Sequence, residues 1–322
     1  MPTKKNSAGK DQPYVPAGNP TGGEYADNET GSNVNYKSDK KRDMEEMARH
    51  PWGYTIPEGK GLSLEFKEGN HKTRKKPISE KLMYNAPNEY LGAWVNSPNE
   101  TSKAIVDSIS RRIHFKKTKD NAAFVVWDGE IQLDERWSRE GLDGQSPRDA
   151  FFHETGHAVD YYRSPYRLVP SNRYSMQIPL SWAYRTEATG KTIYETLNGE
   201  LTPELCARIA HDFWEEESKI GSSEYDKRTK LRSLWSDLSD IYEGATLGDR
   251  GNFGYGHDPE YWTDNMLGQV HRGTEFFAEC FSAKTNSKER YDLIRKYLPN
   301  SCRAFDEVYD KLAKGTPPYE EH

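Results

Sequence analysis

Residues 153–157, with the sequence HETGH, constrain the fold of this chain more than any other feature. Residues four apart lie one above the other on a helix face, so a helical HETGH segment directs two imidazoles to one point. The preceding residues predict such a helix: Ser146 is a favoured N-cap, Pro147 suits the first helical position, and Asp149 completes a capping box. We therefore expect a buried helix that begins at Pro147 and carries a metal site.

The residue types of this segment are those of a zinc hydrolase. Neutral imidazole nitrogens bind zinc at about 2.0–2.1 Å, and the spacing of His153 and His157 allows both to bind one ion. Glu154 can take a proton from a water molecule at the open coordination position and pass it to a leaving amine. We predict His153 and His157 as metal ligands and Glu154 as the general base. The alternative, a chance match, is disfavoured by the capped helix with apolar neighbours.

A later segment, TEFFAECFSA, predicts a second helix with the third ligand, capped by Thr274. Glu275 and Glu279 share one face of it, so one carboxylate can bind the metal while the other orients a ligand histidine. We assign Glu275 to the metal and Glu279 to the histidine; an exposed acidic stripe is the alternative. Asp160 lies on the face of His157 and is predicted to orient an imidazole, with a surface salt bridge as its alternative.

Four side chains are candidates to stabilise the oxyanion of a tetrahedral intermediate: Tyr255, His257, Tyr261 and His271. His257 lies in the segment GNFGYGHDPEYW, where a flexible backbone can present a hydrogen-bond donor. His271 could instead line the cleft, and each histidine could simply pack locally. We name His257 and Tyr261 as the catalytic candidates.

Periodicity predicts a mostly helical α+β fold with one small sheet. Residues 122–133 place two β-branched and aromatic runs around Asp128-Gly129, which predicts a hairpin. Helical patterns dominate from Thr101, which we expect to cap a helix with Ile105, Ile109 and Ile113 on one face. No internal repeat is present.

The chain divides into three predicted parts. Residues 1–41 contain almost no aliphatic side chains and predict a disordered tail. Residues 42–100 are transitional, with a short helix and a strand. Residues 101–316 are expected to form the main domain, with a helical insertion at about 165–250.

Composition narrows the cellular setting. The 322 residues include 45 Lys+Arg and 51 Asp+Glu, and the basic stretch at residues 69–77 lacks interleaved aromatics, which argues against a nucleic-acid partner. No run approaches the roughly 18 apolar residues of a membrane span, and the amino terminus lacks a signal-peptide pattern. Cys206, Cys280 and Cys302 are scattered, so we expect buried thiols and a cytoplasmic setting.

The motifs HETGHAVD and TEFFAECFSA resemble the zinc-binding helices of the anthrax lethal factor catalytic domain. This resemblance implies a zincin-like, gluzincin-type metalloendopeptidase, in which His153, His157 and Glu275 bind Zn2+ and Glu154 is the base. In zincins an edge strand above the active-site helix pairs with the substrate, so the predicted hairpin would align a protein or peptide.

The order of motifs over residues 100–315 is also similar to the zincin-like domains of bacteriophage minor head proteins. The segment QPYVPAGNPTGGEYA resembles phage-associated tail segments of the form PAGnPtGG. These likenesses imply a phage or prophage protein, located in the bacterial cytoplasm or the virion, with phage head components as partners.

Two features depart from the lethal factor pattern. More residues separate His157 from Glu275 than in many gluzincins, which implies the helical insertion, and no tyrosine lies between Trp262 and Glu275. The main alternative to a peptidase is a non-catalytic phage structural protein that keeps a zincin-like fold. An effector acting on a host protein would share the peptidase chemistry.

Overall fold

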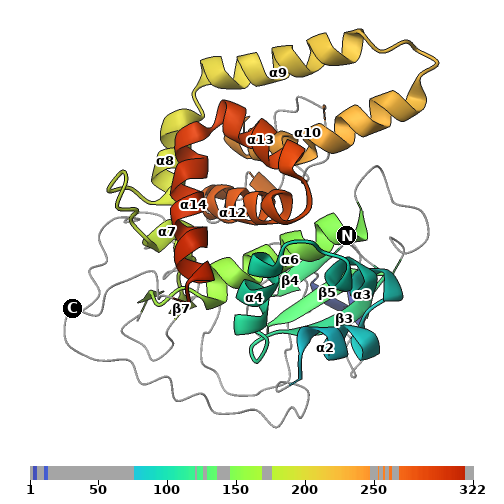
Figure 1. Cartoon of the computed structure of the whole chain (residues 1–322), viewed down its shortest axis with the longest axis vertical. Helices are drawn as coiled ribbons and strands as arrows, with labels where there is room; N and C mark the ends of the chain where they lie inside the picture. The colour runs from blue at the N-terminus through green and yellow to red at the C-terminus, as the bar shows by residue number, and fades with distance from the viewer. Residues whose placement is uncertain are drawn as a thin grey trace.

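Two helices from distant parts of the chain pack against each other at the centre of the molecule (Figure 1). The computed structural model describes residues 3–5, 11–13, 76–119, 122–125, 129–135, 146–168, 176–246, 253, 257, 261–262 and 268–315. Helix α6 (Pro147–Tyr162) carries the HETGH segment, and α12 (Gly268–Asn286) carries Glu275 and Glu279. Their packing brings the two predicted sets of metal-binding residues together.

Nine further helices surround this pair in the described part of the chain. They are α2 (Ile78–Asn85), α3 (Asn88–Val95), α4 (Glu100–Ser108), α7 (Leu180–Ala183), α8 (Ile193–Glu200), α9 (Pro203–Ser218), α10 (Tyr225–Thr246), α13 (Lys288–Tyr297) and α14 (Pro299–Ala313). In Figure 1, α9 and the start of α10 extend side by side from the rest of the molecule. The predicted α+β class with mostly helical content is confirmed.

The predicted small sheet is present and mixed. Its strands are β3 (His114–Thr118), β4 (Ala123–Val125) and β5 (Glu130–Asp134), in the order β3-β5-β4, with β3 parallel and β4 antiparallel to β5. Gly129 has φ +75° between β4 and β5, where a Cβ would collide with the carbonyl of Arg112. The predicted hairpin is therefore confirmed. Phe124 of β4 packs edge-on against Tyr161 and Tyr162 of α6, so β4 is the sheet edge beside the HETGH helix.

The start of α6 is determined by local chemistry. The Ser146 hydroxyl accepts a hydrogen bond from the backbone N–H of Asp149, and the Asp149 carboxylate accepts one from the N–H of Ser146. Pro147 occupies the first turn, where its missing N–H removes no helical hydrogen bond. The predicted capping box is thus confirmed, and it sets the helical register of the motif.

A glycine inside the motif allows the close approach of α6 and α12. A Cβ at Gly156 would lie 3.0 Å from the Cα of Ala278 and 3.2 Å from the Cβ of Phe281. Real side chains rarely approach so closely, so only glycine permits this helix spacing. The spacing in turn determines how far Glu275 reaches toward the histidines.

Two predicted helix starts are wrong. Helix α4 is capped by Asn99, whose side chain accepts from the N–H of Ser102 at 3.0 Å, rather than by Thr101. Thr274 does not cap α12, since the helix begins at Gly268, and its hydroxyl donates to the backbone carbonyl of His271 at 3.1 Å. In both cases residues earlier in the chain extend the helix.

The core also includes residues before Thr101, the predicted start of the main domain. Ile78 and Leu82 of α2 are fully buried, and Trp94 of α3 packs at 6.0 Å and 6.3 Å from the rings of Phe151 and Phe152. Helix α3 therefore packs directly against the HETGH helix, and α2 packs against α3 and β3. The three cysteines are buried as predicted.

Several predictions concern other regions. Within the described part of segment 1–41, β1 (Thr3–Lys5) pairs antiparallel with β2 (Asp11–Pro13). The rest of this segment lies outside the described residues. So do the short helix and the strand expected after it, and most of the basic stretch. The region of the predicted insertion contains β6 (Arg167–Leu168), β7 (Met176–Gln177) and α7 to α10. Among the described helices, none combines the length and apolar character that a membrane span requires.

Candidate metal centre

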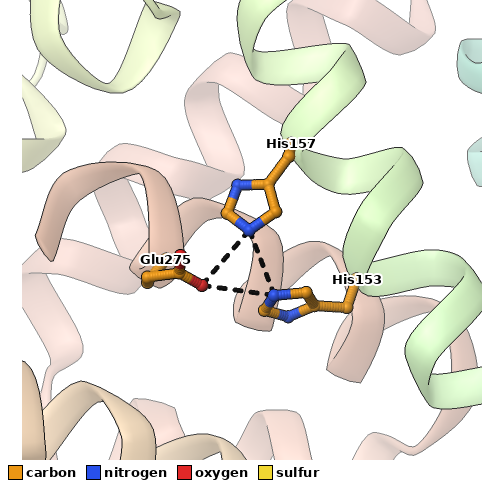
Figure 2. A group of neighbouring side chains, drawn as sticks. All are labelled: His153, His157 and Glu275. Atoms are coloured by element: carbon orange, nitrogen blue, oxygen red, sulfur yellow. Dashed lines mark hydrogen bonds and ion pairs between the residues drawn. The ribbon is translucent and has the colours of Figure 1, made fainter. Parts of the chain in front are cut away.

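Three predicted ligands converge on one point (Figure 2). The Nε2 atoms of His153 and His157 lie 3.1 Å apart, and each lies 3.2 Å from Oε2 of Glu275. Both histidines come from α6, one turn apart, while Glu275 reaches them from α12. This arrangement could hold a metal ion.

The charges of these groups favour a cation between them. Oε2 of Glu275 is buried without a hydrogen bond, although two imidazole nitrogens face it. Burial would raise the pKa of Glu275, but the nearby His157 and His257 hold it well below its usual value. Burial would lower the pKa of His153, but Glu279 and Glu275 hold it well above its usual value. Lone pairs from three groups meet in a site that stabilises positive charge, which a metal ion would supply.

Glu154 is beside this point and nearly buried, with 8% of its surface exposed. Burial raises the pKa of its carboxyl group, and the charges of His153 and His157 partly oppose that rise. A carboxylate with a raised pKa is a stronger base than one in water, as general-base catalysis requires.

The two acidic residues predicted to orient a histidine have different partners. Oε1 of Glu279 lies 3.4 Å from Nδ1 of His153, which places it behind that ring as predicted. Asp160 instead accepts hydrogen bonds from the backbone N–H of Ser181 at 2.8 Å and from its hydroxyl at 2.6 Å. The prediction that Asp160 binds an imidazole is therefore wrong, and since it is 1% exposed, so is the surface salt bridge. Its role is to anchor the start of α7.

Tyr261, His257 and His271 form a stack of three rings beside Glu275. The Tyr261 ring lies 4.1 Å from that of His257 on one side and 3.9 Å from that of His271 on the other. The Tyr261 hydroxyl donates to Oε1 of Glu275, whereas Oε2 is the oxygen that faces His153 and His157. Tyr261 thus holds the predicted ligand, and the stack holds Tyr261. Tyr255 lies outside the described residues.

His257 is oriented by an aspartate that the sequence analysis missed. Oδ1 of Asp240 lies 2.9 Å from Nδ1 of His257 and accepts from its backbone N–H at 3.2 Å. The other ring nitrogen, Nε2, lies 4.0 Å from Oε1 of Glu275. Burial would lower the pKa of His257, but Asp240 and Glu275 raise it to about 10. The raised pKa favours the protonated imidazole at neutral pH, with Nε2 directed toward the candidate ligand Glu275.

Asp240 belongs to α10, inside the region predicted as an insertion. Residues 235–241 of this helix are buried on every side, including Asp237 and Asp240. Two aspartates one turn apart among apolar residues are the sequence signal that could have indicated an interior role.

Two other groups of potential ligands are present among the described residues. Asp240, His257 and Glu275 have ligand atoms within 4.8 Å of one another, but the short contact with Asp240 already occupies Nδ1 of His257. His211, Asp212 and Glu215 lie on the exposed side of α9, where acidic groups need no ion. The group on α6 and α12 is the best candidate because it combines burial with converging lone pairs.

Comparisons with protein-family models, curated proteins and solved structures give no match for this chain. The interpretation of the site therefore depends on its own geometry and chemistry.

Proposed function

We propose that this protein is a zinc-dependent metallopeptidase whose active site is the group formed by α6 and α12. The observation that carries this proposal is the convergence of His153, His157 and Glu275, with Glu154 buried next to the first ligand. Two histidines and one carboxylate leave a fourth position open, as catalytic rather than structural zinc sites do.

The distances between the ligand atoms suit zinc. Ligand atoms bound at about 2.0–2.1 Å in a tetrahedral arrangement lie about 3.3–3.4 Å from one another. The corresponding separations here are 3.1, 3.2 and 3.2 Å, so small side-chain movements would complete the site. Nitrogen and carboxylate donors without thiolates also match a hydrolytic zinc site.

Different residues of the site have different roles in peptide hydrolysis. Bound zinc would act as a Lewis acid toward a peptide carbonyl and a water molecule. Glu154 accepts the proton of the water and delivers it to the amine that leaves. His257, held by Asp240, is the donor best placed to stabilise the oxyanion, while Tyr261 fixes the Glu275 carboxylate.

The edge strand β4 supports a peptide as substrate. It lies beside α6 at the edge of the sheet, where its outward backbone groups can pair with an extended chain. Under this proposal the fold is zincin-like, and the phage or prophage origin inferred from sequence remains part of the proposal. A non-catalytic phage structural protein is the outcome to be excluded.

The test combines metal content with turnover. We expect about one zinc per chain in wild-type protein purified without chelators or metal-affinity resin, and little zinc in His157→Ala. Glu154→Gln should keep its zinc while losing turnover of a peptide library by several orders of magnitude. His211→Ala, on the exposed side of α9, is the matched control and should retain both.

Two results would overturn the proposal. Absence of zinc in the wild type, even after metal is added back, would remove the site itself. Equal turnover by wild type and Glu154→Gln would show that Glu154 is not the base.

A further inference from the structure

A buried arginine connects three helices behind the metal centre. Arg290 of α13 is 7% exposed, and its Nη1 lies 2.7 Å from Oδ1 of Asp149, the capping residue of α6. Its Nε donates to Oδ2 of Asp237 on α10 at 2.8 Å, and its Nη2 pairs with the other oxygen. Nη2 also donates to the hydroxyl of Ser236 at 3.1 Å.

The contacts continue from Asp237 to a metal ligand. Asp237 also faces Glu279 on α12: burial raises the pKa of Asp237, so that its carboxyl group can donate a hydrogen bond to the Glu279 carboxylate. Oε1 of Glu279 in turn lies 3.4 Å from Nδ1 of His153. The connected groups therefore begin at His153 of α6, pass through α12, α10 and α13, and return to α6 at Asp149. Two residues of α6 one turn apart, Asp149 and His153, are therefore linked through the same buried guanidinium.

The composition of this network indicates more than structural support. Arg290 between Asp149 and Asp237 would already be a satisfied buried cation. Because Asp237 and Glu279 share a proton, Arg290 faces two carboxylate charges, that of Asp149 and that of the Asp237–Glu279 pair, and the network carries one excess negative charge. Glu279 lies against the imidazole of His153, so this excess charge faces the candidate metal ligand.

We propose that Asp237 and Arg290 are positioning residues of the metal centre. They hold Glu279 against Nδ1 of His153, which fixes the ring with Nε2 directed toward the metal ion. This inference rests on the proposed zinc site and adds to it residues from α10 and α13.

The test measures zinc affinity of the full chain by competition with a chromogenic chelator. Asp237→Ala should weaken zinc binding about 10- to 100-fold, as loss of such supporting contacts typically does. Asp237→Asn should bind zinc with an affinity between those of Asp237→Ala and wild type, because its amide can donate to Glu279 but offers only one oxygen to accept from Arg290. Asp306→Ala is the matched control: this carboxylate accepts from Tyr291 and pairs with Arg295 but contacts no residue of the network.

A double-mutant cycle separates positioning from general destabilisation. If Asp237 acts through Glu279, the double variant Asp237→Ala/Glu279→Ala should bind zinc no more weakly than Glu279→Ala alone. Additive losses would overturn the inference, as would wild-type affinity of Asp237→Ala or an Asp237→Asn variant as weak as Asp237→Ala. Should Asp237→Ala fail to fold by circular dichroism, Arg290→Lys serves instead. Lysine keeps the positive charge but cannot make the bidentate contact with Asp237, so the zinc affinity of Arg290→Lys should fall by more than threefold. Unchanged affinity would overturn the inference.

The outcomes distinguish this inference from the proposed function. If the wild type binds no zinc, both fail. If the wild type binds zinc and loses it in His157→Ala, while Asp237→Ala binds as tightly as wild type, only the positioning role fails.

Discussion

Replacing Gly156 with alanine tests whether the contact between α6 and α12 determines the geometry of the site. The added Cβ would meet the Cα of Ala278 at 3.0 Å, the Cβ of Phe281 at 3.2 Å and the carbonyl oxygen of Ala278 at 3.3 Å. Two of these atoms are backbone and cannot rotate away. The helices must therefore separate by a few tenths of an ångström to approach the ordinary contact distance of about 3.5–4.0 Å.

Two opposing effects set the size of the change in stability. Alanine favours the helical state over glycine by about 1 kcal/mol. Overpacking a tight contact costs about 1–3 kcal/mol. We expect Gly156→Ala to be destabilised by about 1 kcal/mol in the absence of metal, because the steric cost exceeds the gain in propensity.

A second glycine isolates the steric part. Gly92 lies inside α3, where a Cβ would meet only the Asn96 side chain, at an ordinary 3.9 Å. Gly92→Ala should therefore be stabilised by about 0.5–1 kcal/mol. Since both substitutions gain the same helix propensity, the difference between them reports the cost of forcing α6 and α12 apart.

Urea unfolding with a chelator present measures both variants, and zinc competition measures the site. Separation of the helices moves Glu275 away from His153 and His157, so Gly156→Ala should also bind zinc more weakly, whereas Gly92→Ala should not. The reasoning would be refuted if Gly156→Ala were stabilised as much as Gly92→Ala.

Two further predictions concern pH. Asp240→Asn should move the alkaline limb of kcat/KM to lower pH, because the pKa of His257, about 10 beside Asp240, falls toward its ordinary value of 6.5; a pH–rate profile with an unchanged limb would contradict this. Burial raises the pKa of Asp160 to about 7, although hydrogen bonds from Ser181 act in the opposite direction. The Asp160 carboxyl group therefore binds its proton more tightly in the folded state than in the unfolded state. Its contribution to stability should therefore fall as pH rises from about 4 to about 7. Asp160→Asn should lose that dependence when unfolding is followed by urea in chelator at several pH values, and an identical pH dependence in both proteins would argue against it.

Local chemistry made much of the candidate site predictable. The capping box spans only Ser146 to Asp149, so its hydrogen bonds follow from residue types three apart. His153 and His157 share a face because of helical periodicity, and the same rule relates Glu275 to Glu279. The hairpin followed from a turn glycine that tolerates positive φ. Each of these predictions depended on neighbours within one or two turns.

Predictions that reached beyond one helix were less secure. Asp160 was assigned to an imidazole because it lies on the correct face of α6, but Ser181 of α7 packs there and takes both carboxylate oxygens. Helix propensity does not specify which partner occupies a face. The expected cap at Thr274 was wrong for a related reason, because α12 continues past a residue that would suit its start.

Tertiary structure alone decided which residues complete the site. Asp237, Asp240 and Arg290 are far from the HETGH segment in sequence, and polar residues on long helices are usually solvated. Only the packing of α10 and α13 against each other and against α12 buries these side chains, where their charges must find partners. The sequence by itself determined the helix, the spacing and the residue types of the candidate metal-binding groups, because these depend on local periodicity. The distance between α6 and α12 and the residues behind the ligands depend on contacts between distant segments, which no local pattern encodes.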